Sequence, residues 1–256
     1  MQTRSLHLRL WRASAVLAIV AILASLDVPA TESNPHAAQW ESEIRAFETA
    51  DETNPPPHGA ILFLGSSSIR KWQTLAEDFP GLKVLNRGFG GSHLADSVAF
   101  AERIVIPYKP RLVLLYAGDN DIAAGKSPEE VLADFRAFVR KIRAALPQTQ
   151  IAYISIKPCP AREKYLDLIK TTNRLIKEYV EANDKLRFID VFTPMLTQEG
   201  RPRPDLFLQD GLHPNARGYA VWTAIIRPIL EQSEYDRSAA EHTVKKKPQA
   251  PNSKPQ

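Results

Sequence analysis

The stretch AILFLGSSS, residues 60–68, joins an apolar run to a small polar turn. Its first five residues carry no polar side chain, which is typical of a strand that is buried on both faces. Three further runs share this character and a fourth is weaker: residues 84–85, 112–115, 151–154 and 188–191. Buried strands of this kind predict a sheet that is mainly parallel.

Helical patterns fill the intervals between these runs. They cover residues 39–51, 92–104, 127–146, 161–182 and 214–230. The third has the clearest start, because Ser127 can cap the helix and Pro128 suits its first turn. The alternation of strand and helix predicts an α/β fold with helices on both faces of the sheet. Ligands in such folds bind beyond the carboxyl ends of the strands, so the residues there are informative.

The composition of the 256-residue chain is that of an ordinary globular protein, with 44% hydrophobic and 24% charged residues. This length allows one domain with an adequate core and appendages at its ends. The formal net charge is +4. No basic stripe is interleaved with aromatic residues, so nucleic acid is not an expected partner. Cys159 is the only cysteine, which excludes an internal disulfide.

The two ends of the chain differ from its centre. Residues 1–30 combine a basic start, an apolar run and small residues before Thr31, which predicts a signal peptide and a periplasmic or secreted protein. An uncleaved N-terminal anchor with transient membrane contact is the alternative, although the apolar run is short for a membrane helix. We expect a linker and helix over residues 31–58, the folded domain over residues 59–231, and a disordered basic tail over residues 232–256.

Polar or glycine-rich turns follow the first three predicted strands. A serine of residues 66–68 on a tight strand-to-helix turn exposes its hydroxyl near the positive end of a helix, although three serines can also simply cap that helix. Residues 86–92, NRGFGGS, hold three glycines, which form either a tight turn or a backbone loop that directs N–H groups at a ligand. Asn120, after the third strand, supplies a neutral amide of the kind that holds an oxyanion.

A nucleophilic serine needs a base, and the six histidines leave one strong candidate. Four lie in the predicted signal, in the predicted tail or ahead of the first strand: His7, His242, His36 and His58. His93 opens the second helix near the glycine loop, where it has a surface or substrate-facing position. His213 follows Asp210 by three residues, so a turn can bring this carboxylate to Nδ1 of the imidazole.

In these features the sequence resembles the SGNH hydrolases, also called the GDSL-type esterase family. Four separated segments match the blocks of that family in order: residues 63–67, 88–91, 118–121 and 210–213. The resemblance covers about residues 60–230. It implies a three-layer α/β/α sandwich with a flavodoxin-like parallel sheet of about five strands in the order 2-1-3-4-5. It also implies an acyl-enzyme mechanism that uses no metal or cofactor.

The resemblance implies roles for five residues. Ser67 matches the nucleophile, His213 the general base, and Asp210 the carboxylate that orients this base. The backbone N–H groups of Ser67 and Gly91 and the side chain of Asn120 match the oxyanion hole.

The sequence departs from the family at one position, because Ser66 replaces the usual aspartate before the nucleophile. That aspartate mostly orders the turn, so the change concerns local support. It also leaves a choice of nucleophile among residues 66–68. Trp72 stands at the offset from Gly65 where related sequences often have a tryptophan, and this favours Ser67.

We therefore expect a serine esterase that hydrolyses short-chain, above all acetyl, esters of a small molecule, carbohydrate or lipid. The sequence shows no large lid insertion, which favours small acyl groups. A thioesterase or a lysophospholipase on the same site is the nearest chemical variant. An inactive carbohydrate-binding module, or an envelope-tethered scaffold that uses the basic tail, is the alternative from a different class.

Overall fold

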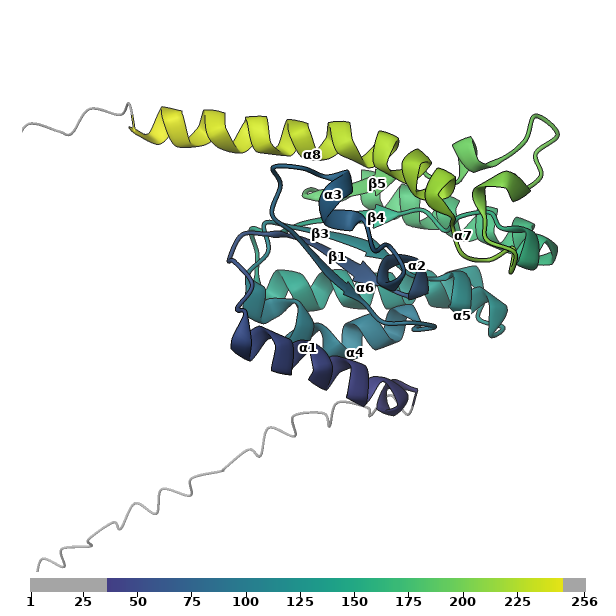
Figure 1. Cartoon of the computed structure of the whole chain (residues 1–256), viewed down its shortest axis with the longest axis horizontal. Helices are drawn as coiled ribbons and strands as arrows, with labels where there is room; N and C mark the ends of the chain where they lie inside the picture. Colours follow the sequence, from purple (N-terminus) through teal and green to yellow (C-terminus); the bar gives the residue numbers. More distant parts are fainter. Residues whose placement is uncertain (1–35, 246–256) are drawn as a thin grey trace, which may run out of the picture. The chain divides into compact units, whose positions relative to one another are not determined.

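Five parallel strands form one sheet in the order β2-β1-β3-β4-β5 (Figure 1). The structure is a computed structural model that describes residues 36–245, with side chains as far as residue 233. The strands are β1 Ile61–Gly65, β2 Val84–Gly88, β3 Leu112–Tyr116, β4 Gln150–Ile154 and β5 Leu186–Ile189. Gly65 at the end of β1 lies beside Gly88 of β2 and Tyr116 of β3. The predicted strand order is confirmed, and the carboxyl ends of β2, β1 and β3 lie side by side at one end of the sheet.

Helices cover both faces of this sheet, as the alternating pattern predicts. The α-helices are α1 Glu41–Thr53, α2 Ser67–Arg70, α3 Leu75–Asp78, α4 Leu94–Ile104, α5 Asp119–Ala123, α6 Pro128–Ala145, α7 Leu166–Glu181 and α8 Ala216–Lys245. Short 3-10 segments are η1 Ala37–Trp40, η2 Ile106–Tyr108, η3 Pro160–Tyr165, η4 Thr193–Met195 and η5 Pro204–Leu206. The helix predicted over residues 161–182 divides into η3 and α7, and Arg162 within η3 departs from helical φ and ψ.

Successive residues of each strand point to opposite faces of the sheet. Leu62 and Leu64 of β1 join the core cluster that α1, α4, α6 and α7 cover. Ile61 and Phe63 join the cluster on the other face, under α3 and α8. Figure 1 shows α1, α4 and α6 on one side of the sheet, with α3 and α8 on the other. The result is the predicted three-layer α/β/α sandwich.

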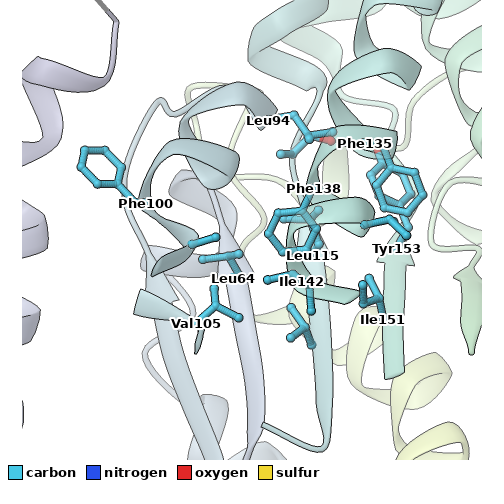
Figure 2. Close-up of a cluster of buried hydrophobic side chains, with 14 of the residues drawn as sticks. Leu64, Leu94, Phe100, Val105, Leu115, Phe135, Phe138, Ile142, Ile151 and Tyr153 are labelled. Atoms are coloured by element: carbon cyan, nitrogen blue, oxygen red, sulfur yellow. Dashed lines mark hydrogen bonds between the residues drawn. The ribbon is translucent and has the colours of Figure 1, made fainter. Parts of the chain in front are cut away.

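Helix α6 illustrates how the hydrophobic pattern builds this core. Its Phe135, Phe138 and Ile142 recur at helical spacing and are fully buried. Figure 2 shows Phe138 and Ile142 near Leu64 and Leu115 of the central strands, and Phe135 against Tyr153 of β4. Burial of each such side chain contributes about 1.5–3 kcal/mol, so the layer is held mainly by these contacts.

The start of α6 agrees with the sequence prediction. The hydroxyl of Ser127 accepts a hydrogen bond from the backbone N–H of Glu130, and the Glu130 carboxylate accepts one from the N–H of Ser127. Pro128 occupies the first turn. This capping box satisfies donors that the first turn of a helix leaves without partners.

Helix α1 is part of the folded body and packs on α4. Arg103 of α4 donates hydrogen bonds to the carboxylates of Glu41 and Glu48 of α1. Arg87 of β2 pairs with Asp51 near the other end of α1. The segment predicted as a linker and helix before the domain therefore forms one edge of the helical layer.

Helix α8 continues to Lys245, beyond residue 230 where the pattern predicts its end. Residues 232–245, predicted as disordered, are therefore helical. The sequence has no Pro or Gly between residues 229 and 247 and holds three Glu, three Lys and two Ala there, which are good helix formers. The predicted signal peptide and the last residues of the tail lie outside the described residues. Within residues 36–245, no helix has the length and apolar character needed to cross a membrane.

Candidate active site

A glycine at the end of β1 lets the chain turn sharply into α2. Gly65 has φ +141°, and a Cβ there would lie 1.9 Å from the carbonyl oxygen of Tyr116, so no other residue fits. The hydroxyls of Ser66 and Ser68 are buried and have no hydrogen-bond partner among the described residues. Ser67 is half-buried at the start of α2. The turn thus presents the hydroxyl of Ser67 at the edge of the sheet.

The loop before α8 brings His213 to this hydroxyl. Nε2 of His213 lies 3.0 Å from Oγ of Ser67, and Nδ1 lies 2.7 Å from Oδ2 of Asp210. The other carboxylate oxygen accepts hydrogen bonds from the backbone N–H groups of Leu212 and His213, both at 2.9 Å. The structure therefore brings Ser67, His213 and Asp210 together in the order that a nucleophile, its base and an orienting carboxylate require.

The carboxyl group of Asp210 is held in its ionised form. Desolvation raises its pKa, but the hydrogen bonds from the His213 ring and from the two backbone N–H groups outweigh this effect and hold the pKa of Asp210 well below its usual range. An ionised partner at Nδ1 keeps the proton of the neutral imidazole on that nitrogen. Nε2 then faces Ser67 as an acceptor.

We expect kcat/KM to fall in acid, because the proposed reaction needs a neutral imidazole at His213. Asp210 stays ionised over the same range, whereas a protonated Nε2 cannot accept the proton of Ser67. A profile of kcat/KM against pH checks this, with the melting temperature at each pH as the control for unfolding. Activity that stays flat from acid to neutral pH contradicts the role of His213.

Three donors suited to an oxyanion lie at the ends of β1, β2 and β3. They are the backbone N–H groups of Ser67 and Gly91 and the side-chain amide of Asn120. Neither backbone N–H donates a hydrogen bond within the part of the chain that the structure describes. Nδ2 of Asn120 donates to the carbonyl oxygen of Ser92 at 3.0 Å, which places the amide beside Gly91. This bond uses one hydrogen of Nδ2, and the second is left for a ligand.

Asn120→Ala is expected to lower kcat by roughly 10²–10³-fold, the usual cost of losing one oxyanion donor. The melting temperature should change little, because the side chain is only half-buried. Steady-state kinetics with 4-nitrophenyl acetate and a thermal melt check both statements. Asn183→Ala is the matched control, since that amide only caps the end of α7 by donating to Tyr179. An unchanged kcat in Asn120→Ala removes this residue from the oxyanion hole.

A buried charged cluster lies directly behind Asn120. Oδ1 of Asn120 accepts a hydrogen bond from Nη2 of Arg162 at 2.7 Å. The neighbouring Asp119 places Oδ2 2.9 Å from Nζ of Lys157, 3.0 Å from the Tyr116 hydroxyl and 3.3 Å from Nη1 of Arg162. Desolvation raises the pKa of Asp119, but the charges of Lys157 and Arg162 outweigh it and lower that pKa to about 2. Sequence reasoning missed Lys157 and Arg162, although both follow the carboxyl end of β4.

Residues that precede the sheet also reach the site. A Cβ on Gly91 would lie 3.2 Å from the ring of Trp40, so this indole stands against the glycine that the sequence predicts for the oxyanion hole. The indole N–H donates to Oδ2 of Asp96 at 3.3 Å, and Nδ1 of His36 lies 2.7 Å from the same oxygen. These contacts fix η1 beside the glycine loop. No sequence signal pointed to Trp40, because it lies ahead of the first strand.

His36, His93 and Asp96 are the described residues that could hold a metal ion, with one ligand atom each within 4.8 Å of the others. The two imidazole rings stack at 4.1 Å with planes 12° apart, so their in-plane lone pairs do not meet at one point. Asp96 also already accepts hydrogen bonds from Trp40 and from the backbone N–H of His93. Burial lowers the pKa of His93, which favours a neutral ring in this stack.

A groove of about 550 Å³ borders the turn that carries the base. Its lining residues are Pro160, Glu163, Thr197, Glu199, Arg201, Pro202 and Pro204. The backbone N–H of Ala161, next to Pro160, donates to the carbonyl oxygen of Gly211 at 3.0 Å, and Gly211 lies between Asp210 and His213. A cavity of about 270 Å³ near Leu112, Gln150 and Leu186 lies instead at the amino ends of the strands, away from Ser67.

This fold and site define an ester-hydrolysing enzyme. The chain belongs to the GDSL-like lipase/acylhydrolase family, because the model of that family matches residues 58–221. The resemblance drawn from the four sequence blocks is therefore confirmed. No curated protein matches the sequence.

Solved structures similar to this one have low sequence identity. A GDSL-like lipase from Bacteroides thetaiotaomicron is 21% identical, covers 75% of this chain and 98% of its own, and has a TM-score of 0.65. A carbohydrate esterase family 3 protein from Talaromyces cellulolyticus is 19% identical, with 69% and 98% covered and a TM-score of 0.55. A variant of an acetylxylan esterase from Geobacillus stearothermophilus is 17% identical, with 66% and 93% covered and a TM-score of 0.55. At these identities the likeness shows the fold alone.

Proposed function

We propose that this protein is a serine esterase that hydrolyses short-chain, above all acetyl, carboxylic esters through an acyl-enzyme. The observation that carries the proposal is the row of hydrogen bonds from Ser67 through His213 to Asp210. The amide of Asn120 and two backbone N–H groups that have no hydrogen-bond partner among the described residues supply, beside this row, the donors that acyl transfer needs.

In the proposed reaction, Oγ of Ser67 attacks the ester carbonyl and gives its proton to Nε2 of His213. The negative charge that forms on the carbonyl oxygen is held by the N–H groups of Ser67 and Gly91 and by Nδ2 of Asn120. The protonated imidazole then donates its proton to the leaving alkoxide, and the acyl group remains on Ser67. Water, deprotonated by the same imidazole, releases the acid and restores the serine.

The position of Trp40 beside the proposed oxyanion hole favours a substrate with a small acyl group. Trp40 stands against Gly91 and is fixed there by its hydrogen bond to Asp96. A large rigid ring at this point limits the space next to the carbonyl carbon of a bound ester. The acetyl esterases among the similar solved structures agree with a preference for acetyl groups.

The groove next to the turn of Asp210 and His213 favours an ester whose alcohol part is polar. We propose that this alcohol is a carbohydrate. It presents the carboxylates of Glu163 and Glu199 and the guanidinium of Arg201, groups that can bind sugar hydroxyls. Similar structures include an acetyl-xylooligosaccharide esterase and a carbohydrate esterase family 3 protein. If residues 1–30 direct export, as we propose, polysaccharides of the cell envelope or the surroundings are within reach.

Acetate esters should therefore be preferred. We expect kcat/KM to fall by about tenfold or more from 4-nitrophenyl acetate to 4-nitrophenyl butyrate, because a tight pocket discriminates against added methylene groups. Trp40→Ala should reduce this preference by enlarging the space. Hydrolysis of acetate, butyrate and octanoate esters and acetate release from acetylated xylooligosaccharides check this. The control is Phe47→Ala, which removes a ring that packs on Arg87 of the edge strand β2.

The alternatives give different results when acyl thioesters and a binding assay with xylooligosaccharides are added to these measurements. A preference for long acyl chains points to a lysophospholipase, and faster turnover of acyl thioesters points to a thioesterase. Binding of xylooligosaccharides by folded protein without hydrolysis of any ester points to a carbohydrate-binding module.

A further inference from the structure

We propose that Arg162 is a positioning residue for ester hydrolysis, which holds the amide of Asn120 so that its free N–H faces the oxyanion. The inference rests on the proposed function, because it assigns Arg162 a role through the oxyanion hole. Its basis is the 2.7 Å hydrogen bond between Nη2 of Arg162 and Oδ1 of Asn120.

The two partners of Asn120 fix the orientation of its amide. Arg162 can only donate hydrogen bonds and the carbonyl oxygen of Ser92 can only accept them. Oδ1 must therefore face Arg162, and one hydrogen of Nδ2 must face Ser92. The second hydrogen of Nδ2 then has one direction left. Without Arg162 the oxygen end of the amide has no described partner, and of these two hydrogen bonds only the one to Ser92 still restrains the side chain.

Arg162 is itself fixed by its surroundings. It lies at a kink within η3, with φ −123° and ψ 20°, and its side chain is only 15% exposed. The preceding residue, Ala161, donates its backbone N–H to Gly211 in the turn that carries Asp210 and His213. One short segment therefore contacts both the turn that carries His213, through Gly211, and the side chain of Asn120.

The cluster around Arg162 carries an excess of positive charge. Lys157 and Arg162 flank a single carboxylate, that of Asp119. The pKa of Tyr116 lies well above its usual value because the hydroxyl is buried and next to Asp119, so the phenol is neutral. The net charge of about +1 behind Asn120 favours the anion that forms on the other side of the amide.

Arg162→Ala tests the proposal without an unpaired buried charge, because Asp119 keeps its ion pair with the fully buried Lys157. We expect kcat for 4-nitrophenyl acetate to fall by roughly 10- to 100-fold with little change in KM, a smaller loss than that of the donor itself. Guanidinium, added far below denaturing concentrations, should restore part of kcat. Arg162→Lys keeps the positive charge but loses the planar guanidinium and its paired N–H donors. Its kcat should therefore lie between those of Arg162→Ala and the parent. Arg174→Met, which removes a surface pair on α7, is the control.

The decisive comparison is the double variant Asn120→Ala with Arg162→Ala. If Arg162 acts through Asn120, its loss has little further effect once Asn120 is absent. Additive losses in kcat, or a fall in melting temperature that alone accounts for the lost activity, overturn the role of Arg162. A parent protein without esterase activity, or an Asn120→Ala variant with full kcat, refutes the proposed function instead.

Discussion

Ser67→Ala is expected to lower kcat for 4-nitrophenyl acetate by about 10⁴–10⁶-fold, the range found when a serine hydrolase loses its nucleophile. The hydroxyl of Ser67 lies 3.0 Å from Nε2 of His213, and in the proposed reaction the acyl-enzyme forms on it. Without it, only the oxyanion donors and substrate binding still accelerate attack by water. Initial rates and a titration of active sites by the burst of 4-nitrophenol measure the loss.

The neighbouring serines supply matched controls for this change. Ser66→Ala and Ser68→Ala remove hydroxyls that are buried and lack a hydrogen-bond partner among the described residues. Both variants should keep kcat close to that of the parent. If Ser67→Ala retains activity while Ser66→Ala or Ser68→Ala loses it, the nucleophile has been assigned to the wrong residue.

Asp119→Ala should cost about 3–5 kcal/mol in the free energy of unfolding, because it leaves buried cations without their carboxylate. Lys157 is fully buried and its ammonium pairs with Asp119 at 2.9 Å. For a protein of this size the loss corresponds to a fall in melting temperature of roughly 6–20 °C. Thermal and urea unfolding of the variant and the parent measure it.

The same carboxylate gives this contribution a dependence on pH. Its folded-state pKa, about 2, lies below the value of about 3.9 in an unfolded chain, so the ionised group stabilises the fold above about pH 4. That stabilisation is lost as the pH falls through 2. The difference in stability between parent and variant should therefore shrink in acid.

Asp167→Ala is the control for this prediction, because the side chain of Asp167 is 97% exposed and pairs only loosely with Lys170. Its free energy of unfolding should stay within about 0.5 kcal/mol of the parent. Equal effects of the two substitutions contradict the structural role given to the buried cluster.

Much of the fold could be predicted from the sequence because local patterns and the global topology agree. The apolar runs at residues 60–64 and 112–115 are buried on both faces, as their composition indicated. The position of the serine after β1 could also be predicted, because a residue just beyond Gly65 lies at the carboxyl end of a strand in a parallel sheet. His213 and Asp210 were found because a three-residue spacing allows their side chains to meet in one turn.

The parts that were missed depend on contacts between distant segments. Arg162 and Asn120 are 42 positions apart, and no local pattern shows that a guanidinium will meet this amide. Trp40 reaches Gly91 only because α1 packs on α4. The extension of α8 to Lys245 was missed for another reason: a charged, polar composition was interpreted as disorder although its residues are good helix formers.

The most direct test of the serine mechanism is to treat the purified protein with a fluorophosphonate probe and to locate the adduct by mass spectrometry. We expect one adduct per chain, on Ser67, that is absent in Ser67→Ala and forms much more slowly in His213→Ala. An adduct on another serine, or no adduct on protein whose thermal melt shows it to be folded, would contradict this mechanism.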